Sequence, residues 1–191
     1  MANALSSRDQ LDEAIERYRD VLRYDQRIYG EDNGFTITVL NNLAVATQRA
    51  GRLGESVQYL RQVTEARSRI GDESRDAITN LFNLASVLEK RGEFEESLSR
   101  FAQLFPRAEN KIPKTHWLYG QFRKGYGTLL RRLERYGEAE VETLAGLEIM
   151  EKSLGKDHPR VVKVLEELVE LYKAWGRPAD AERYAARLKG K

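Results

Sequence analysis

The sequence predicts an all-α protein built as a row of antiparallel helix pairs, and three observations lead to this prediction. Small residues recur at a nearly fixed distance, because Ser56, Ser97, Ala139 and Ala181 lie 41, 42 and 42 residues apart. The apolar residues between them follow the spacing of helix faces, and the chain has only four prolines. A repeat of about 42 residues is the length of one helix pair stacked on its neighbours.

The small residues are expected where the two helices of a pair approach most closely, because a larger side chain there would push the helices apart. A fifth small residue, Ala14, precedes Ser56 by 42 positions. The preceding helices repeat in the same way, through Leu43, Leu84, Tyr126 and Leu168. The period is therefore carried by both helices of each pair.

Composition excludes several classes of function. Lysine and arginine total 32 against 30 aspartates and glutamates, a net charge of +2, so no charge field argues for nucleic acid or a membrane surface as partner. There is no cysteine, which excludes disulfides and thiolate metal sites and fits a reducing compartment. No stretch approaches the roughly 20 apolar residues of a membrane span. We expect a cytoplasmic protein without cofactor or metal.

About nine helices are expected in one repeat domain over residues 10–189. Residues 1–9 are polar and are expected to be frayed or disordered. A leading helix follows, which has no first helix of its own and therefore either caps the row or exposes an apolar face. The predicted ranges are 10–30 for the leading helix and 35–71, 74–112, 114–155 and 158–189 for the helix pairs.

Local signals place the turns and the exceptions. Gly51, Gly92 and Gly176 are expected to end first helices, since glycine accepts a positive φ. Glu134 replaces the glycine in the third pair. Pro106 lies inside a second helix, which is expected to kink or end early there, leaving a looser connection over 107–113.

These residues resemble the tetratricopeptide repeat, in the variant of about 42 residues found in kinesin light chains and many bacterial proteins. The resemblance covers roughly residues 10–189 and rests on Asn42-Leu43-Ala44, Asn83-Leu84-Ala85, the turn glycines and the small residues that follow them. The period would also suit HEAT or armadillo repeats, but this order of residues favours the tetratricopeptide type. The resemblance implies a right-handed superhelical solenoid, and the last residues also look like the end of repeat regions in larger bacterial proteins.

The resemblance further implies that first helices line a concave groove that binds a peptide or protein segment. Asn42 and Asn83 could grip a peptide backbone, or they could bond neighbouring helices. The basic residues could attract an acidic peptide, or they could be solvated. Acidic residues of the last pair, such as Glu167, would repel such a ligand, bind a basic segment instead, or pair along their helix. The implied groove residues are Asn41, Asn42, Gln48, Arg49, Asn83, Ser86, Lys90, Lys124, Arg131 and Arg132.

Catalysis finds little support in the sequence. His116 and His158 are the only histidines, and they lack the spacing of a metal site. Trp117, Tyr119 and Phe122 could form an aromatic pocket, although such residues more often pack in the core. We expect a non-catalytic scaffold for protein–protein interaction. The alternative is self-association, as a homodimer, through exposed apolar faces of the terminal repeats.

Overall fold

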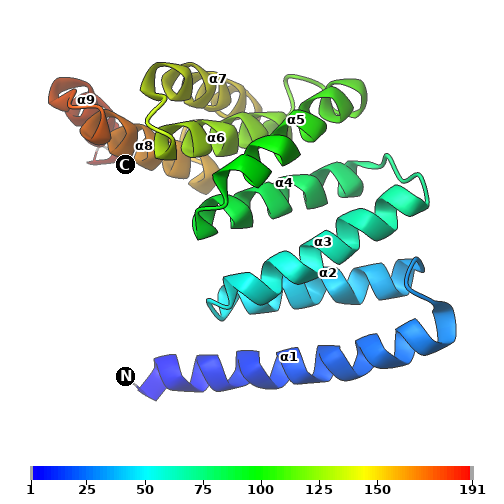
Figure 1. Ribbon diagram of the computed structural model, residues 1–191. Coiled ribbons are helices and arrows are strands. Elements are labelled where there is room, and N and C mark those ends of the chain that lie inside the picture. Colours follow the sequence, from blue (N-terminus) through cyan, green and yellow to red (C-terminus); the bar gives the residue numbers. More distant parts are fainter. Residues whose placement is uncertain (1, 190–191) are drawn as a thin grey trace. The chain divides into compact units, whose positions relative to one another are not determined.

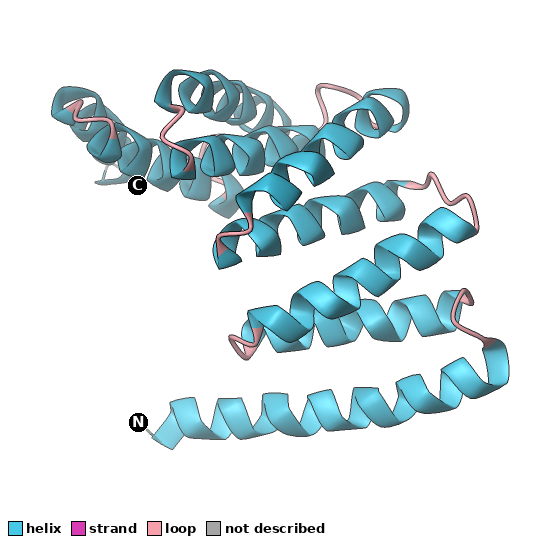
Figure 2. Cartoon of the chain, viewed as in Figure 1, coloured by secondary structure: helices cyan, strands magenta, loops and turns pink. Residues whose placement is uncertain are grey.

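The protein is all-α, as the sequence predicts. The computed structural model describes the backbone of residues 2–189 and the side chains of residues 10–188, and the described backbone contains helices joined by short loops, with no strand (Figures 1 and 2). The helices are α1 (Ala2–Tyr29), α2 (Gly34–Arg49), α3 (Leu53–Arg69), α4 (Arg75–Arg91), α5 (Phe94–Lys111), α6 (Trp117–Arg132), α7 (Tyr136–Leu154), α8 (Pro159–Ala174) and α9 (Pro178–Lys189).

The chain forms two compact units that divide inside α5. The first unit ends at Leu104 and the second begins at Phe105. In the first unit, α1, α2 and α3 bury apolar side chains against one another around Ile15, Leu43 and Val63. In the second unit, α6 to α9 enclose a core of their own. The prediction of one repeat domain over 10–189 stays a prediction.

Close approach at the small residues is confirmed in the first two pairs. Ser56 is fully buried, and its hydroxyl donates a hydrogen bond of 2.8 Å to the carbonyl oxygen of Ala44 on the preceding helix. Ser97 makes the same bond, also 2.8 Å, to Ala85. The hydroxyl therefore lies directly against the neighbouring backbone, a position where a bulkier side chain would cause overpacking.

Ion pairs join the second helices of successive pairs in the first unit. Arg19 on α1 binds Glu55 on α3, and Arg61 on α3 binds Glu96 on α5. The hydrogen bond from Arg61 holds the pKa of Glu96 below its usual value. Successive pairs are therefore joined by ion pairs between their second helices as well as by apolar contacts in the core.

Two expectations about helix ends require correction. α1 begins at Ala2 rather than near Gln10, because residues 2–9 contain neither proline nor glycine to stop it. α5 runs through Pro106 to Lys111, so its expected early end is wrong. Proline removes one backbone donor, but the following turns are anchored by Ala108 and Ile112, which are buried in the second unit.

The turn of the third pair has the positive φ of the other turns, although its residue is not glycine. Gly51, Gly92 and Gly176 have φ of 76°, 82° and 72°. Glu134 occupies the corresponding position with φ of 60°. A side chain in this left-handed region costs about 1 kcal/mol relative to glycine. The third turn therefore forms against the preference of its own residue.

Replacing Glu134 with glycine should raise the free energy of unfolding by about 1 kcal/mol, because it removes this strain. Urea unfolding followed by circular dichroism would measure the change. The control, Gly176→Ala, should lower the free energy of unfolding by a similar amount. An unchanged or lowered stability for Glu134→Gly would contradict this description of the turn.

Candidate functional site

A polar hollow lies between the first helices of the first two pairs. It has a volume of about 290 Å³ and is formed by two residues of α2, one of α3 and four of α4. Its lining residues are Thr38, Asn41, Arg67, Asp76, Thr79, Asn80 and Asn83. We call it the α2–α4 hollow. All of these side chains are polar or charged, which separates the hollow from the apolar contacts around it.

Asn80 is the most deeply placed of these side chains. It is only 4% exposed, and its Nδ2 donates a hydrogen bond of 2.8 Å to Oδ1 of Asn41, which links the two first helices. Its own Oδ1 is buried without a partner. The equivalent positions in the other pairs hold Val39, Phe122 and Val164, all buried and apolar. A carboxamide therefore occupies a position that the repeat otherwise fills with core residues.

Arg67 also differs from its equivalents in the following pairs, although α1 has the buried and charged Asp25 at this position. Its equivalents in the following second helices are Ala108 and Met150, both fully buried. The Arg67 side chain is 20% exposed and forms an ion pair with Asp72, while its Nε is buried without a partner. Leaving a buried polar atom unpaired typically costs about 1–3 kcal/mol. The hollow thus presents one unmet donor, Arg67 Nε, and one unmet acceptor, Asn80 Oδ1.

Asp72 holds Arg67 in place. The Asp72 carboxylate also accepts a hydrogen bond of 2.8 Å from the backbone N–H of Ser74, just before α4. Burial acts to raise the pKa of Asp72, but the hydrogen bonds from Ser74 and Arg67 outweigh it and hold the pKa below its usual value. The charged form of Asp72 is therefore part of the folded structure.

Among the groove residues that the sequence predicts in the first unit, Asn41 and Asn83 line the hollow. Asn42 is half-buried beside it on α2 and is not part of the lining. The others lie further along α2 and α4 toward the carboxyl ends of these helices: Ser86, Gln48, Arg49 and Lys90. Their role in binding stays a prediction.

In the second unit, two predicted groove cations are paired within the protein. Glu167 on α8 is only 11% exposed, and its carboxylate lies 2.6 Å from Nε of Arg131 and 3.7 Å from Nζ of Lys124, both on α6. Arg132 is exposed at the end of α6. Glu167 therefore neutralises basic charge on the neighbouring helix, so that less of this charge remains to attract an acidic ligand.

The groove residues implied by the sequence do not include Arg67, Asp76 or Asn80, which line the hollow. Asn80 could have been found by aligning the repeats, because it is polar where its equivalents are apolar. Asp76 carries no comparable signal, since it lies in the first turn of α4, where acidic residues are common. The repeated Asn-Leu-Ala pattern points to Asn42 and does not include the buried Asn80.

The remaining candidates have structural roles. His116 and His158 cap α6 and α8, each accepting a backbone N–H through Nδ1. Tyr119 and Phe122 are buried, and Trp117 stacks under Arg160 at 4.3 Å. Among the described residues, no group of histidine and acidic side chains could hold a metal ion, and no helix is long and apolar enough to cross a membrane.

These helix pairs, with a polar hollow between successive first helices, define a helical-repeat protein. The tetratricopeptide repeat model matches residues 1–69, 38–110 and 115–188. The chain therefore belongs to the tetratricopeptide repeat family, and the resemblance noted in the sequence is confirmed. A comparison with curated proteins found no match.

Solved structures share the fold. BtubC (BKLC) from P. vanneervenii is 20% identical, with 98% of this chain and 75% of that chain covered and a TM-score of 0.81. A putative kinesin light chain from Podosopora anserina is 18% identical, with 99% and 90% covered and a TM-score of 0.81. A Rap protein complexed with competence and sporulation factor is 16% identical, with 96% and 51% covered and a TM-score of 0.71. At these identities the likeness shows the fold alone.

Replacing Glu167 with glutamine should lower the free energy of unfolding by about 2 kcal/mol, because Arg131 and Lys124 lose their partner in a largely buried position. Chemical denaturation would measure the change. As a control, Glu170→Gln removes an exposed pair with Lys173 and should cost less than about 0.5 kcal/mol. Equal effects of the two substitutions would show that Glu167 is merely solvated.

Replacing Asp72 with asparagine should lower the free energy of unfolding at neutral pH by about 1–2 kcal/mol, through loss of its charge-assisted hydrogen bonds. A depressed pKa in the folded state gives stabilisation that is present above the unfolded pKa of about 3.9 and is lost as pH falls through the folded pKa. The difference from wild type should therefore narrow below about pH 4. A difference independent of pH would contradict this role.

Proposed function

We propose that this protein is a non-catalytic scaffold that binds an extended peptide segment of a partner protein in the α2–α4 hollow. The observation that carries the proposal is Asn80, a carboxamide at a position where the other pairs place buried apolar residues, together with Arg67 beside it. Polar groups at such positions destabilise the fold unless they are paired, so a ligand that pairs them accounts for their presence.

The chemistry of the hollow suits a peptide main chain. A peptide unit offers one C=O and one N–H, and the half-buried side chains of Asn41 and Asn83 line the hollow from two helices. Each of these carboxamides has both a donor and an acceptor, so each can pair with a peptide unit. Recognition of this kind depends on the ligand backbone and tolerates varied side chains.

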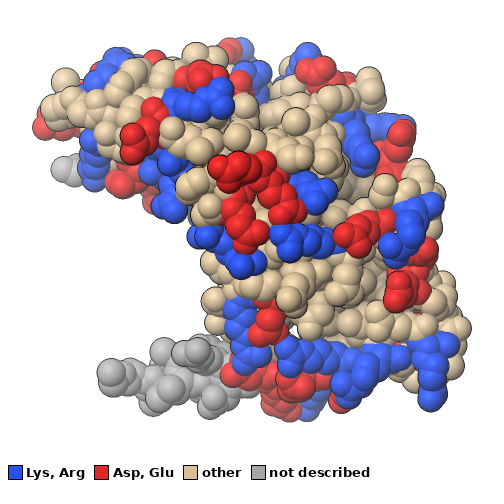
Figure 3. Space-filling view, viewed as in Figure 1, with Lys and Arg blue, Asp and Glu red and all other residues tan. Residues whose placement is uncertain are grey.

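The charges near the hollow favour acidic side chains at one end of the ligand. Arg49 and Lys90 occupy equivalent places in the last turns of α2 and α4, and both are exposed. Neither forms an ion pair with the described part of the chain. Figure 3 shows both signs of charge on the visible face, with acidic side chains gathered over α5. Arg49 and Lys90 are the cations that would favour acidic side chains at this end of the ligand.

The comparisons support the class of function. Tetratricopeptide repeat proteins are generally scaffolds for protein–protein interaction, and the similar Rap structure contains a bound factor. We further propose a cytoplasmic location, for which the absence of cysteine is the supporting feature.

Self-association is a second candidate function. The observation that favours it is a row of exposed apolar side chains on α1, which include Val21, Tyr24 and Ile28. Because α1 contributes nothing to the α2–α4 hollow, both functions can operate in one protein.

The proposal can be tested by selecting ligands from a displayed library of random peptides on the whole chain. The selected peptide is then titrated by fluorescence anisotropy. Asn80→Val and Asn83→Ala should each weaken binding by about tenfold or more, which corresponds to one or two lost hydrogen bonds. The matched control is Gln58→Ala, which removes an exposed carboxamide of α3 outside the hollow and should leave affinity unchanged. Circular dichroism would verify that each variant is folded.

Two outcomes would contradict the proposal. One is selection of peptides whose affinity is the same for wild type, Asn80→Val and Asn83→Ala. The other is a failure of the library to yield any peptide that binds above background.

A further inference from the structure

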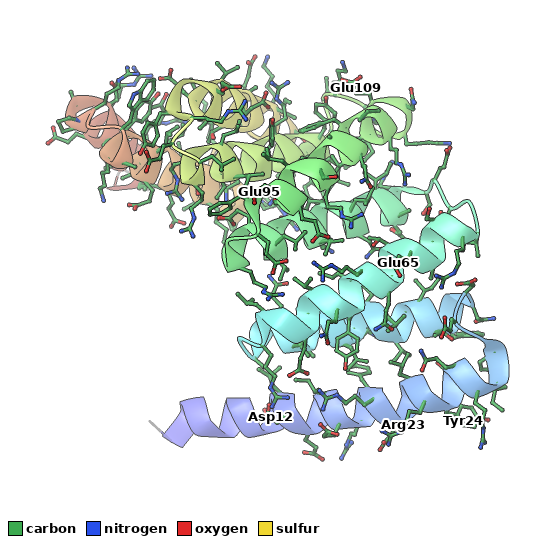
Figure 4. The ribbon with its side chains drawn as sticks, viewed as in Figure 1. Asp12, Arg23, Tyr24, Glu65, Glu95 and Glu109 are labelled. Carbon is green, nitrogen blue, oxygen red and sulfur yellow. The ribbon has the colours of Figure 1, made fainter. Side chains whose placement is uncertain are left out.

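One face of α1 carries exposed apolar side chains, with Asp25 buried beside them. Ile15 and Leu22 on the inner face are buried against α2. On another face, Val21, Tyr24 and Ile28 are 45%, 55% and 50% exposed. Figure 4 shows Tyr24 pointing away from α2. We call the row of Ala14, Tyr18, Val21, Tyr24 and Ile28 the α1 stripe.

The repeat shows what normally covers this stripe. In α3 the equivalents of Ala14, Tyr18 and Val21 are Ser56, Leu60 and Val63, which are buried in a pair with α2. Their equivalents in α5, which pairs with α4, are buried too: Ser97, Phe101 and Leu104. An antiparallel helix packs on this face in both pairs. On α1 the same positions, with Arg17, surround an open hollow of about 260 Å³.

The turn that joins the two helices of each later pair is not present before the α1 stripe. In the first full pair, Gly51 and Arg52 end the first helix and begin the second. Their equivalents before α1 are Asp9 and Gln10, and both lie inside α1, whose helical backbone continues through them. No chain reversal occurs at this position, so a helix on the α1 stripe must arrive by another route.

We infer that α1 of a second copy of this chain covers the stripe in an antiparallel arrangement. Ala14, Arg17, Tyr18 and Val21 have the i, i+3, i+4, i+7 spacing of a hole that accepts one side chain from a facing helix. Ile28, two helical turns beyond Val21, is an exposed side chain of suitable shape. Each copy therefore carries both a hole and a side chain to fill it.

This self-complementarity fixes the geometry. If Ile28 of each copy fills the hole of the other, the two-fold axis passes between Val21 and Tyr24, and Val21 of one copy lies beside Tyr24 of the other. The adjoining face of α1 is charged and exposed, with an Arg17–Glu13 pair and an Arg23–Asp20 pair (Figure 3). The interface is therefore confined to the stripe.

The inference develops the self-association candidate and does not depend on peptide binding. Sedimentation of the whole chain over a wide concentration range should show a reversible dimer. Val21→Glu should raise the dimer dissociation constant at least tenfold, because it places a charge at the axis. The control, Arg27→Glu, changes an exposed residue outside the stripe and should leave the dissociation constant unchanged. Asn80→Val should also leave it unchanged, which separates this test from that of the hollow.

Cross-linking tests the register directly, because the chain has no cysteine of its own. A mixture of Val21→Cys and Tyr24→Cys chains should form a mixed disulfide under mild oxidation. Ala14→Cys should not link to itself, since the two Ala14 positions would lie about 25 Å apart at 1.5 Å rise per residue. A wild-type chain that stays monomeric up to millimolar concentration, or preferential linking of Ala14→Cys, would overturn the inference.

Discussion

The structure depends on each helix covering an apolar face of its neighbour, because no helix of a repeat protein can bury that face alone. Contact is closest at Ser56 and Ser97, where a hydroxyl binds the carbonyl oxygen of the facing helix at 2.8 Å. Because of this requirement, each position of the repeat is expected to be buried and apolar, buried and small, or exposed. A residue that differs from its equivalents in the other pairs is therefore informative even without comparison to other sequences.

Asn80, Arg67 and the α1 stripe are the informative departures. The first two bring unpaired polar atoms into the protein at positions where the following pairs have apolar core residues. The α1 stripe is the opposite case, since its apolar side chains are exposed at positions that are buried in the following pairs. Both departures destabilise the isolated chain, and both are relieved by a suitable partner.

Much of the fold could be predicted because it is set by local chemistry that repeats. Gly51, Gly92 and Gly176 mark turns, and the serines mark close contacts, whatever the rest of the chain does. The course of α5 could not be predicted from Pro106 alone. The burial of Ala108 and Ile112 outweighs one lost hydrogen bond, and that burial is a property of the folded unit.

Less of the candidate site than of the fold could be predicted from the sequence. Asn41 and Asn83 lie in the hollow as a helical register implies, but the family pattern gives no weight to Asn80. The pairing of Arg131 and Lys124 with Glu167 joins residues more than 35 positions apart and depends on how α6 packs against α8. Charge counted along the sequence therefore overstates the basic character available to a ligand.

The central claim is that Asn80 is present for a ligand rather than for stability. The free energy of unfolding of Asn80→Val, measured by urea denaturation, tests it most directly. Asn80→Val should be as stable as wild type or more stable, since valine is the residue at the equivalent position of α2. A loss of about 2 kcal/mol or more would show that the Asn41–Asn80 bond holds the fold together, and would contradict the claim.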